Sequence, residues 1–314
     1  VGLAGGSFAI GITYTSAWFE HRRQGTAMGI FGAGNAGAAI TNLVAPLIVV
    51  SFGWRMVPQI YSLAMICMAI IFWLFTFPDP KQLERDRTGT HFRLADQLAP
   101  LKEMRVWRFG IYYFFVFGGF VALALWLPKY YVGEYGLDLK TASLITMCFT
   151  LPSGLIRAFG GWLSDKYGAR HVNWLVFWVS LICLFLVSYP QTTYIVHGIS
   201  GDHTFYIGSN IWFFTFLIFV IGIAQGIGKA SVYRIIHDYY PNNMGSVGGL
   251  VGVIGGLGGF VLPILFGLAS DFLDIRTSCF MLLFGVVALC MIMMHISIRN
   301  MRQKSGLELT ENFT

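Results

Sequence analysis

Long apolar runs alternate with short polar turns along almost the whole chain. Nine of these runs hold about 18–25 residues, the length that an α-helix needs to cross a bilayer. Because hydrocarbon offers no water to bond the backbone, we expect helices and not open strands. The nine segments are Leu3–Phe19, Met28–Phe52, Val57–Phe77, Phe109–Tyr130, Ala142–Leu163, Val172–Tyr189, Ile211–Tyr233, Val247–Ala269 and Ser278–Ile298.

One long, charged, proline-containing stretch, from Pro78 to Trp107, divides this pattern into three segments and then six. We therefore expect four parts: a group of three helices in residues 1–77, a linker in 78–107, a six-helix half in 108–298 and a tail in 299–314. A carrier of six plus six helices that lacks its first three would have this organisation.

Composition agrees with a membrane protein. Hydrophobic residues make up 56% of the 314 residues and charged residues only 11%, whereas soluble domains carry about 25% charged residues. The first residue is Val, and the chain enters an apolar segment with no basic n-region or cleavage site, so the first segment is not a signal peptide. We expect the chain to be a fragment of a longer protein.

Basic residues gather in alternate loops, as the positive-inside rule requires. The clustered residues are Arg22, Arg23, Lys81, Arg85, Arg87, Arg93, Lys102, Arg105, Arg108, Lys166, Arg170, Arg299, Arg302 and Lys304, which are fourteen of the 21 Lys and Arg. The opposite side has only Arg55, Lys129, Lys140 and Arg276. This distribution predicts a multi-pass protein of the cell (inner) membrane with a cytoplasmic C-terminus. The formal charge of +6 then reflects orientation and not nucleic-acid binding.

The sequence offers little support for an enzyme or a metal protein. Its five cysteines all fall in the apolar segments without a C-x-x-C spacing, which argues against a disulfide framework or a zinc site. No nucleophile–base pair or phosphate loop occurs in a fitting context. We expect no catalytic activity, no cofactor and no metal.

Arg157 is the most informative residue, because it lies inside an apolar segment and none of the nine segments contains Asp or Glu. A charged side chain at membrane depth costs at least about 2.5–3.5 kcal/mol and normally faces a partner or a water-filled path. One interpretation is that the side chain extends to the membrane surface. However, helical side chains lean toward the N-terminus, which here points to the membrane centre. We therefore favour a binding site for a small anion.

Two segments are unusually rich in glycine, at Gly29–Asn42 and at Gly245–Gly259. Glycine disfavours a helix by about 1 kcal/mol per residue, so such density needs a packing reason. Gly248, Gly252 and Gly256 recur at every fourth residue, a spacing that lets helix backbones approach closely. Asn35 lies near mid-depth, where its amide either bridges neighbouring helices or contacts the substrate.

The turn Gly161-Trp-Leu-Ser-Asp-Lys-Tyr-Gly168-Ala-Arg170 resembles the G-x-x-x-D-[RK]-x-G-x-[RK] loop of the major facilitator superfamily. Such a turn is either a solvated basic loop or a latch, in which Asp165, Lys166 and Arg170 pair across helix ends and hold one conformation. We favour the latch. Farther along, Lys229 and Arg234 lie in the cytoplasmic third of one segment. We expect Arg234 to extend toward the membrane surface and Lys229 to do so or to attract anions along the inward path.

The glycine-rich segments resemble those of the nitrate/nitrite porter family within that superfamily. Gly32-Ala-Gly34-Asn35-Ala-Gly37 matches the Gly-x-Gly-Asn-x-Gly motif of the family's fifth helix. Gly255-Gly256-Leu257-Gly258-Gly259 matches a second motif on its eleventh helix, with Leu257 in place of the Asn that some members have. The resemblance spans the whole chain, as helices 4–12 of twelve, and implies an all-α major facilitator fold.

The resemblance also implies roles for individual residues. Arg157-Ala-Phe-Gly-Gly-Trp-Leu-Ser-Asp165 fits a family pattern in which the Arg of helix 8 contacts the bound anion. Tyr113 resembles a family tyrosine that bonds the anion, and Phe8 an aromatic residue that walls the site. A second family Arg, on helix 2, lies outside this sequence.

Taken together, these residues predict a carrier that moves nitrate, and nitrite with it, by alternating access. Nitrate/nitrite exchange and nitrate/proton symport both remain open, although the lack of Asp and Glu in the segments favours exchange. A carrier of another small anion and an anion-sensing receptor without turnover are the alternatives. We expect a monomer in the lipid bilayer, with nitrate, nitrite and, for symport, protons as its partners.

Overall fold

The computed structural model describes residues 2–78, 87, 95, 99–199, 201–241 and 243–311; the side chains of some of these residues, Asn35 among them, are not described. Each of the nine predicted segments is helical, and seven described helices are long and apolar enough to cross a membrane. The two remaining segments correspond to the short helix α1 (Gly2–Ala17) and to a helix interrupted at its middle.

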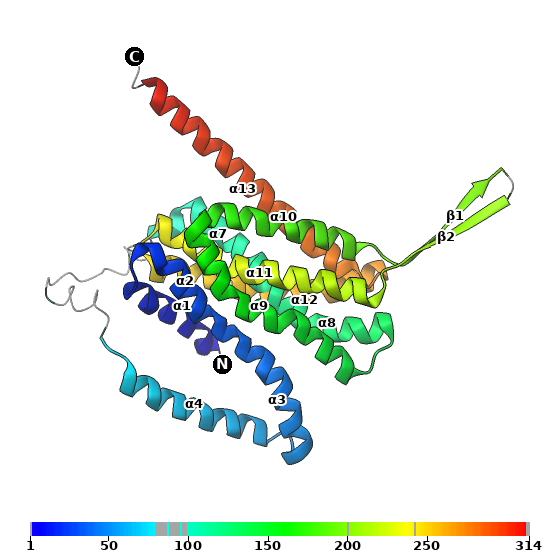
Figure 1. The fold of residues 1–314 in the computed structure, drawn as a ribbon, viewed down its shortest axis with the longest axis horizontal. Helices are drawn as coiled ribbons and strands as arrows, with labels where there is room; N and C mark the ends of the chain where they lie inside the picture. The colour runs from blue at the N-terminus through cyan, green and yellow to red at the C-terminus, as the bar shows by residue number, and fades with distance from the viewer. Residues whose placement is uncertain are drawn as a thin grey trace.

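The first group of helices continues from α1 through a 3-10 turn η1 (His21–Arg23) into the interrupted helix, which consists of α2 (Gln24–Gly32), a 3-10 turn η2 (Ala33–Ala36) and α3 (Gly37–Phe52). Helix α4 (Met56–Phe75) follows and has no buried residue among those described. It meets α3 at the turn that joins the two helices and lies at the margin of the molecule (Figure 1). The predicted linker 78–107 lies mostly outside the described residues.

The second group begins after the 3-10 turn η3 (Ala99–Lys102) with α7 (Met104–Tyr113), the π-helical turn η4 (Phe114–Gly118) and α8 (Gly119–Tyr135), which together form one continuous span. The remaining helices are α9 (Leu139–Tyr167), α10 (Ala169–Ser188), α11 (Ile211–Tyr239), α12 (Met244–Leu273) and α13 (Ser278–Glu311). Helix α7 thus starts inside the predicted linker, and α13 continues through most of the predicted tail.

Local sequence explains where these helices begin and end. Asp138 accepts a hydrogen bond from the Thr141 backbone N–H (3.0 Å) and so caps the start of α9. Gly168 ends the same helix with a φ of +86°, a conformation that L side chains rarely adopt. Asn210 caps the start of α11 by accepting from the Trp212 N–H (3.0 Å).

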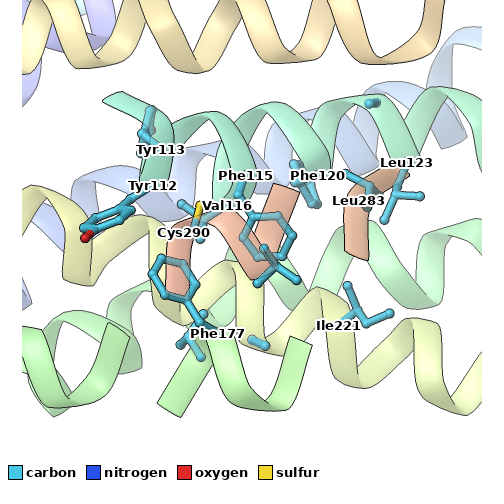
Figure 2. Packing of buried hydrophobic residues seen from close by; sticks show 14 of the residues in the cluster. Tyr112, Tyr113, Phe115, Val116, Phe120, Leu123, Phe177, Ile221, Leu283 and Cys290 are labelled. Carbon is cyan, nitrogen blue, oxygen red and sulfur yellow. The ribbon is translucent and has the colours of Figure 1, made fainter. Parts of the chain in front are cut away.

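Most of the buried core lies in the second group of helices. Phe115 of η4 meets Phe177 of α10, and Val116, Phe120 and residues of α11 and α13 complete the cluster (Figure 2). Of the side chains that the structure describes, few in the first group belong to the core, and α2 is the element of that group that packs most extensively against the second group, along α9. The interface between α2 and α9 therefore holds the two groups together.

A β-hairpin was not predicted. Strands β1 (Thr192–Gly198) and β2 (Gly201–Ile207) pair antiparallel, with Thr192 opposite Ile207 and Gly198 opposite Gly201. The hairpin connects α10 to α11 and projects beyond the end of the helix bundle (Figure 1). The sequence pattern missed it because only long apolar runs were interpreted, and this stretch is short and mixed.

Candidate anion site

Arg157 lies on α9 in the interface with the first group of helices, and only 1% of its surface is exposed. None of its three guanidinium nitrogens has a hydrogen-bond partner among the described residues. The guanidinium carbon lies 4.8 Å from the centre of the Phe8 ring, on α1. A cation–π contact offsets only part of the cost of burying a charge, so this side chain is suited to receive an anion.

Glycines of α2 create the space for this guanidinium. A Cβ atom on Gly32 would overlap Nε of Arg157 and lie 2.5 Å from its Cδ and Cζ. A Cβ on Gly29 would lie 2.7 Å from the Arg157 carbonyl oxygen. The predicted close packing is therefore found at Gly32, where a missing side chain makes room for a charged group.

Two tyrosines complete the wall of the site. Tyr113 is 1% exposed, and its hydroxyl makes no hydrogen bond of normal geometry among the described residues but lies close to the side chains of Arg157 and Tyr233. Its ring meets the Tyr233 ring edge-on at 5.0 Å, and the Tyr233 ring in turn lies 5.7 Å from that of Phe8. Both tyrosines interact electrostatically with Arg157. The structure thus gathers the predicted Phe8, Tyr113 and Arg157 at one place.

Tyr233 was not predicted as part of the site. Its hydroxyl donates a hydrogen bond to the Gly248 carbonyl of α12 at 3.1 Å, which holds the ring against the site. The sequence contained a signal, because Tyr233 follows Lys229 by four residues and therefore shares its helix face.

The glycines of α12 have unequal roles. A Cβ on Gly255 would overlap the Tyr113 ring, one on Gly258 would lie 2.9 Å from Phe114, and one on Gly259 would lie 2.9 Å from Val121. At Gly252 the nearest atom would be the Tyr233 hydroxyl, at 3.3 Å. Close packing against η4 and α8 is confirmed for Gly255, Gly258 and Gly259, whereas Gly252 approaches a side chain.

Three predicted packing glycines have no such contact. No described atom lies within 4 Å of a Cβ placed on Gly34, Gly37 or Gly256. The every-fourth-residue pattern was therefore a poor guide on α12, because the side that faces η4 carries Gly255 and not Gly256. The predicted contact of Asn35 falls on a side chain outside the described residues.

Lys229 of α11 is fully buried, which contradicts the alternative that it extends to the membrane surface. Its ammonium group donates to Oγ of Ser153 at 3.1 Å and lies 3.2 Å from the centre of the Phe120 ring. Ser153 precedes Arg157 by four residues, or about 6 Å of helix. Because Lys229 contacts Ser153, its ammonium group lies about one helical turn from the position of Arg157 on α9.

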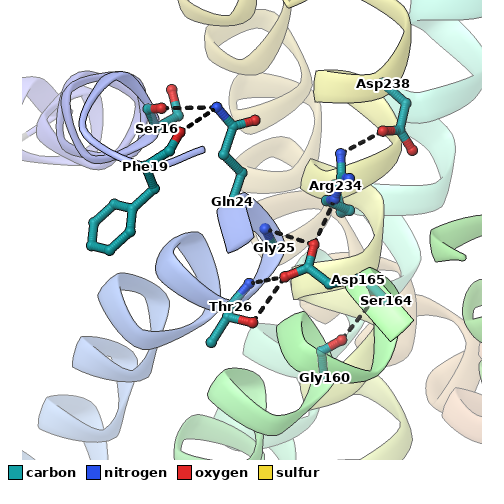
Figure 3. A network of polar contacts seen from close by, with 10 residues as sticks. All are labelled: Ser16, Phe19, Gln24, Gly25, Thr26, Gly160, Ser164, Asp165, Arg234 and Asp238. Atoms are coloured by element: carbon teal, nitrogen blue, oxygen red, sulfur yellow. Dashed lines mark hydrogen bonds and ion pairs between the residues drawn. The ribbon is translucent and has the colours of Figure 1, made fainter. Parts of the chain in front are cut away.

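Asp165, at the end of α9, joins the two groups of helices (Figure 3). Its carboxylate accepts hydrogen bonds from the backbone N–H of Gly25 (3.0 Å) and from the N–H and hydroxyl of Thr26 (both 2.8 Å). These groups belong to the first turn of α2. Arg23, the N-cap residue of this helix, makes no capping hydrogen bond with its side chain. An anion is stabilising there, because the free N–H groups carry partial positive charge. Asp165 thus caps a helix of the other group.

Arg234 is the partner of this carboxylate, so the expectation that it extends to the membrane surface is wrong. It is 7% exposed, donates to Asp165 through Nε at 2.8 Å and also pairs with Asp238 (Figure 3). A buried arginine beside a carboxylate is better satisfied by the ion pair than by a distant headgroup.

The two bases of the predicted latch lie elsewhere. Lys166 is over the rings of Trp162 and Tyr167 on its own helix, and Arg170 bonds the Tyr239 hydroxyl. Of the three predicted latch residues, Asp165 is therefore the one that contacts the other group of helices among the described residues, with support from Arg234.

At the other end of the bundle the two groups are separated by a cavity of about 800 Å³. Thr41, Trp54 and Val57 line it from α3 and its junction with α4, and Leu125, Pro128 and Thr146 line it from α8 and α9. Thr146 precedes Arg157 by eleven residues, or about 16 Å of helix. The molecule is thus joined at the Asp165 end and hollow at the opposite end, with the site sealed between them.

This arrangement favours binding of a small anion over chemistry. Arg157 presents a planar fork of N–H donors, Tyr113 adds a hydroxyl, and aromatic rings exclude water on the side of α1. A guanidinium fork matches planar oxyanions with two parallel hydrogen bonds. Among the described residues, no carboxylate neutralises Arg157, and Asp165 is already bound by Arg234.

Comparison with known proteins places these features in a family. The family model described as Major Facilitator Superfamily matches residues 1–201 and 134–311. A probable nitrate/nitrite antiporter, NarK1, of Thermus thermophilus is 39% identical over 100% of this chain and 72% of its own length. The nitrite extrusion protein of Bacillus subtilis is 29% identical over 87% of this chain. The chain spans only 62% of that second relative's length.

Solved structures agree on the fold. The crystal structure of the major facilitator transporter FucP in the outward conformation aligns with a TM-score of 0.62, at 14% sequence identity, over 92% of this chain and 72% of that one. This likeness supports the fold alone.

Proposed function

The chain belongs to the nitrate/nitrite porter family of the major facilitator superfamily, and we propose that it binds nitrate and nitrite at Arg157 and moves them across the cell membrane. The proposal rests chiefly on one observation: a guanidinium that is 1% exposed and has no hydrogen-bond partner among the described residues. A buried charge without an ionic partner costs several kcal/mol, so an anion that binds there would be strongly stabilised.

Nitrate fits the chemistry of this site. It is planar and spreads a single charge over three oxygens, so two of them can accept parallel hydrogen bonds from the guanidinium. The Tyr113 hydroxyl, which lies close to the Arg157 side chain, is a donor for the third oxygen. The ring of Phe8 and the close approach of α2 to Arg157 limit the volume, which favours small ions over larger organic anions.

Alternating access follows from the two ends of the molecule. The clustered basic loops support a cytoplasmic position for the Asp165 end, where the bonds of Asp165 to α2 and Arg234 hold the two groups of helices together. The 800 Å³ cavity then opens on the outer side. Breaking the Asp165 contacts while closing the cavity would expose Arg157 to the cytoplasm. The C-terminus would be cytoplasmic, and a monomer suffices.

Counterflow tests this function directly. The full-length protein is reconstituted in vesicles loaded with unlabelled nitrate or nitrite, and entry of labelled nitrate is followed. We expect entry to be driven by either internal anion and to be competed by external nitrite more strongly than by chloride or small carboxylates. Equal competition by other anions would favour a general anion carrier. Saturable nitrate binding without any counterflow would favour a receptor.

A further inference from the structure

Lys229 is a second buried cation that anion binding at Arg157 does not directly explain. It is 0% exposed, and no carboxylate among the described residues pairs with it. The polar group that it contacts is the hydroxyl of Ser153, which is also 0% exposed. An ammonium group has three N–H donors, so a single acceptor and the face of Phe120 leave the charged form poorly solvated.

Burial acts most strongly on the protonation of Lys229, and the charged groups around it come second. Of the helices packed on α11, α9 contributes Arg157, and this guanidinium acts electrostatically on Lys229. The carboxylates of Asp165 and Asp238 pair with Arg234 nearer the end of the helix. The hydroxyls of Tyr113 and Tyr233 lie at the level of Arg157. Lys229 is therefore repelled by one cation, and that repulsion falls when an anion neutralises the cation.

The contact with Ser153 suits both forms of the amine. A serine hydroxyl is a donor and an acceptor, so it can accept from the ammonium group or donate to the lone pair of the neutral amine at the same distance of 3.1 Å. The proton can therefore leave and return without a rearrangement of the packed side chains. An arginine, which does not release its proton in proteins, could not do this.

We propose that Lys229 carries one proton with each anion: its amine is neutral while Arg157 holds no anion and protonated while Arg157 holds one. This inference rests on the proposed function. An N–H bond forms when the anion and a proton enter from the same side, and the bond breaks when both leave on the other side. The negative charge of the anion and the positive charge of the proton cancel, so the protein crosses between its two conformations with the same net charge loaded as empty. Transport of the anion and the proton in the same direction is symport. Lys229 replaces the carboxylate whose absence from the predicted segments favoured exchange.

Vesicles of the full-length protein with a pH dye inside test the proposal. With the membrane potential clamped, an inward nitrate gradient should acidify the lumen in the wild type. Lys229→Met removes the proton site, so the acidification should be lost while labelled nitrate still exchanges. Lys229→Arg retains the charge but cannot release a proton, and it should also lose acidification. If acidification were instead retained in Lys229→Arg, the role of Lys229 would be structural or that of a fixed charge.

The wild type alone can overturn the inference, whatever the stability of the variants. Nitrate entry without lumenal acidification would contradict a proton carrier in this protein. Acidification that persists in Lys229→Met would assign the proton to another residue. Labelled nitrate measures counterflow in the same vesicles. If the wild type shows no counterflow, the proposed function itself has failed, independently of the role of Lys229.

Discussion

At the scale of single residues, the site depends on Arg157, a buried cation that no described carboxylate neutralises. Arg157 could be identified from the sequence because a charge in an apolar segment without any acidic residue is conspicuous. Tyr233 and Arg234 could not be assigned in this way. Their roles depend on which side of α11 meets α9 and α12, and periodicity alone does not fix the rotation of a helix against its neighbours.

Gly32 is the residue whose role is simplest to test. The added methyl of Gly32→Ala would overlap the Arg157 guanidinium, so we expect it to displace that side chain and to abolish nitrate transport. Overpacking of this kind costs about 1–3 kcal/mol, which the fold should tolerate. Gly34→Ala is the matched control, because no described atom lies within 4 Å of its Cβ. Uptake is measured in vesicles after normalising for inserted protein, and equal activity of the two variants would refute the assignment.

At the scale of elements, the sequence predicted all nine helical segments but not their details. Apolar length identified the spans, because a bilayer sets that length. The break at Ala33–Ala36, the π-helical turn at Phe114–Gly118 and the hairpin at 192–207 were missed. Each is produced by tertiary packing or by short local pairing that leaves no long periodic signal. The break and the π-helical turn are adjacent to site residues, as irregular turns in helices often are.

The contact of α12 with η4 predicts different effects of two neighbouring substitutions. Gly255→Ala would drive a methyl into the Tyr113 ring, so it should lower thermal stability and transport together. Gly256→Ala meets no described atom within 4 Å and should behave as the wild type does. The melting temperature of the purified protein and the rate of counterflow are the two readouts. A larger effect at Gly256 would mean that α12 is rotated relative to this structure.

The contacts of Asp165 predict a shift between conformations. Asp165→Asn removes the charge that pairs with Arg234 and caps α2; loss of one partner of a buried pair costs about 3–5 kcal/mol. We expect the end of the bundle that carries Asp165 to open more often. Spin labels at the exposed Arg22 and His171 would report this as a longer distance. Lys166→Gln is the control, since Lys166 contacts rings of its own helix. Equal distance distributions in both variants would contradict the latch.

At the scale of the whole molecule, two groups of helices meet along α2 and α9, with the anion site sealed between a joined end and a hollow end. The division at the linker was predicted from one charged stretch. The state of the two ends could not be predicted, because sequence patterns carry no information on which of two packings is populated. The family resemblance predicted the helix order and the substrate class. The residues themselves explained why a charged side chain, Arg157, lies inside an apolar segment.

Nitrate binding to purified full-length protein tests the central claim most directly. Titration calorimetry should show saturable binding in the wild type. Arg157→Lys retains the charge but loses the two-pronged geometry, and hydrogen bonds to charged groups contribute about 1.5–3 kcal/mol, so binding should be roughly tenfold to a hundredfold weaker. Uptake should be lost while membrane insertion is unchanged. Wild-type affinity and normal uptake in Arg157→Lys would contradict the account.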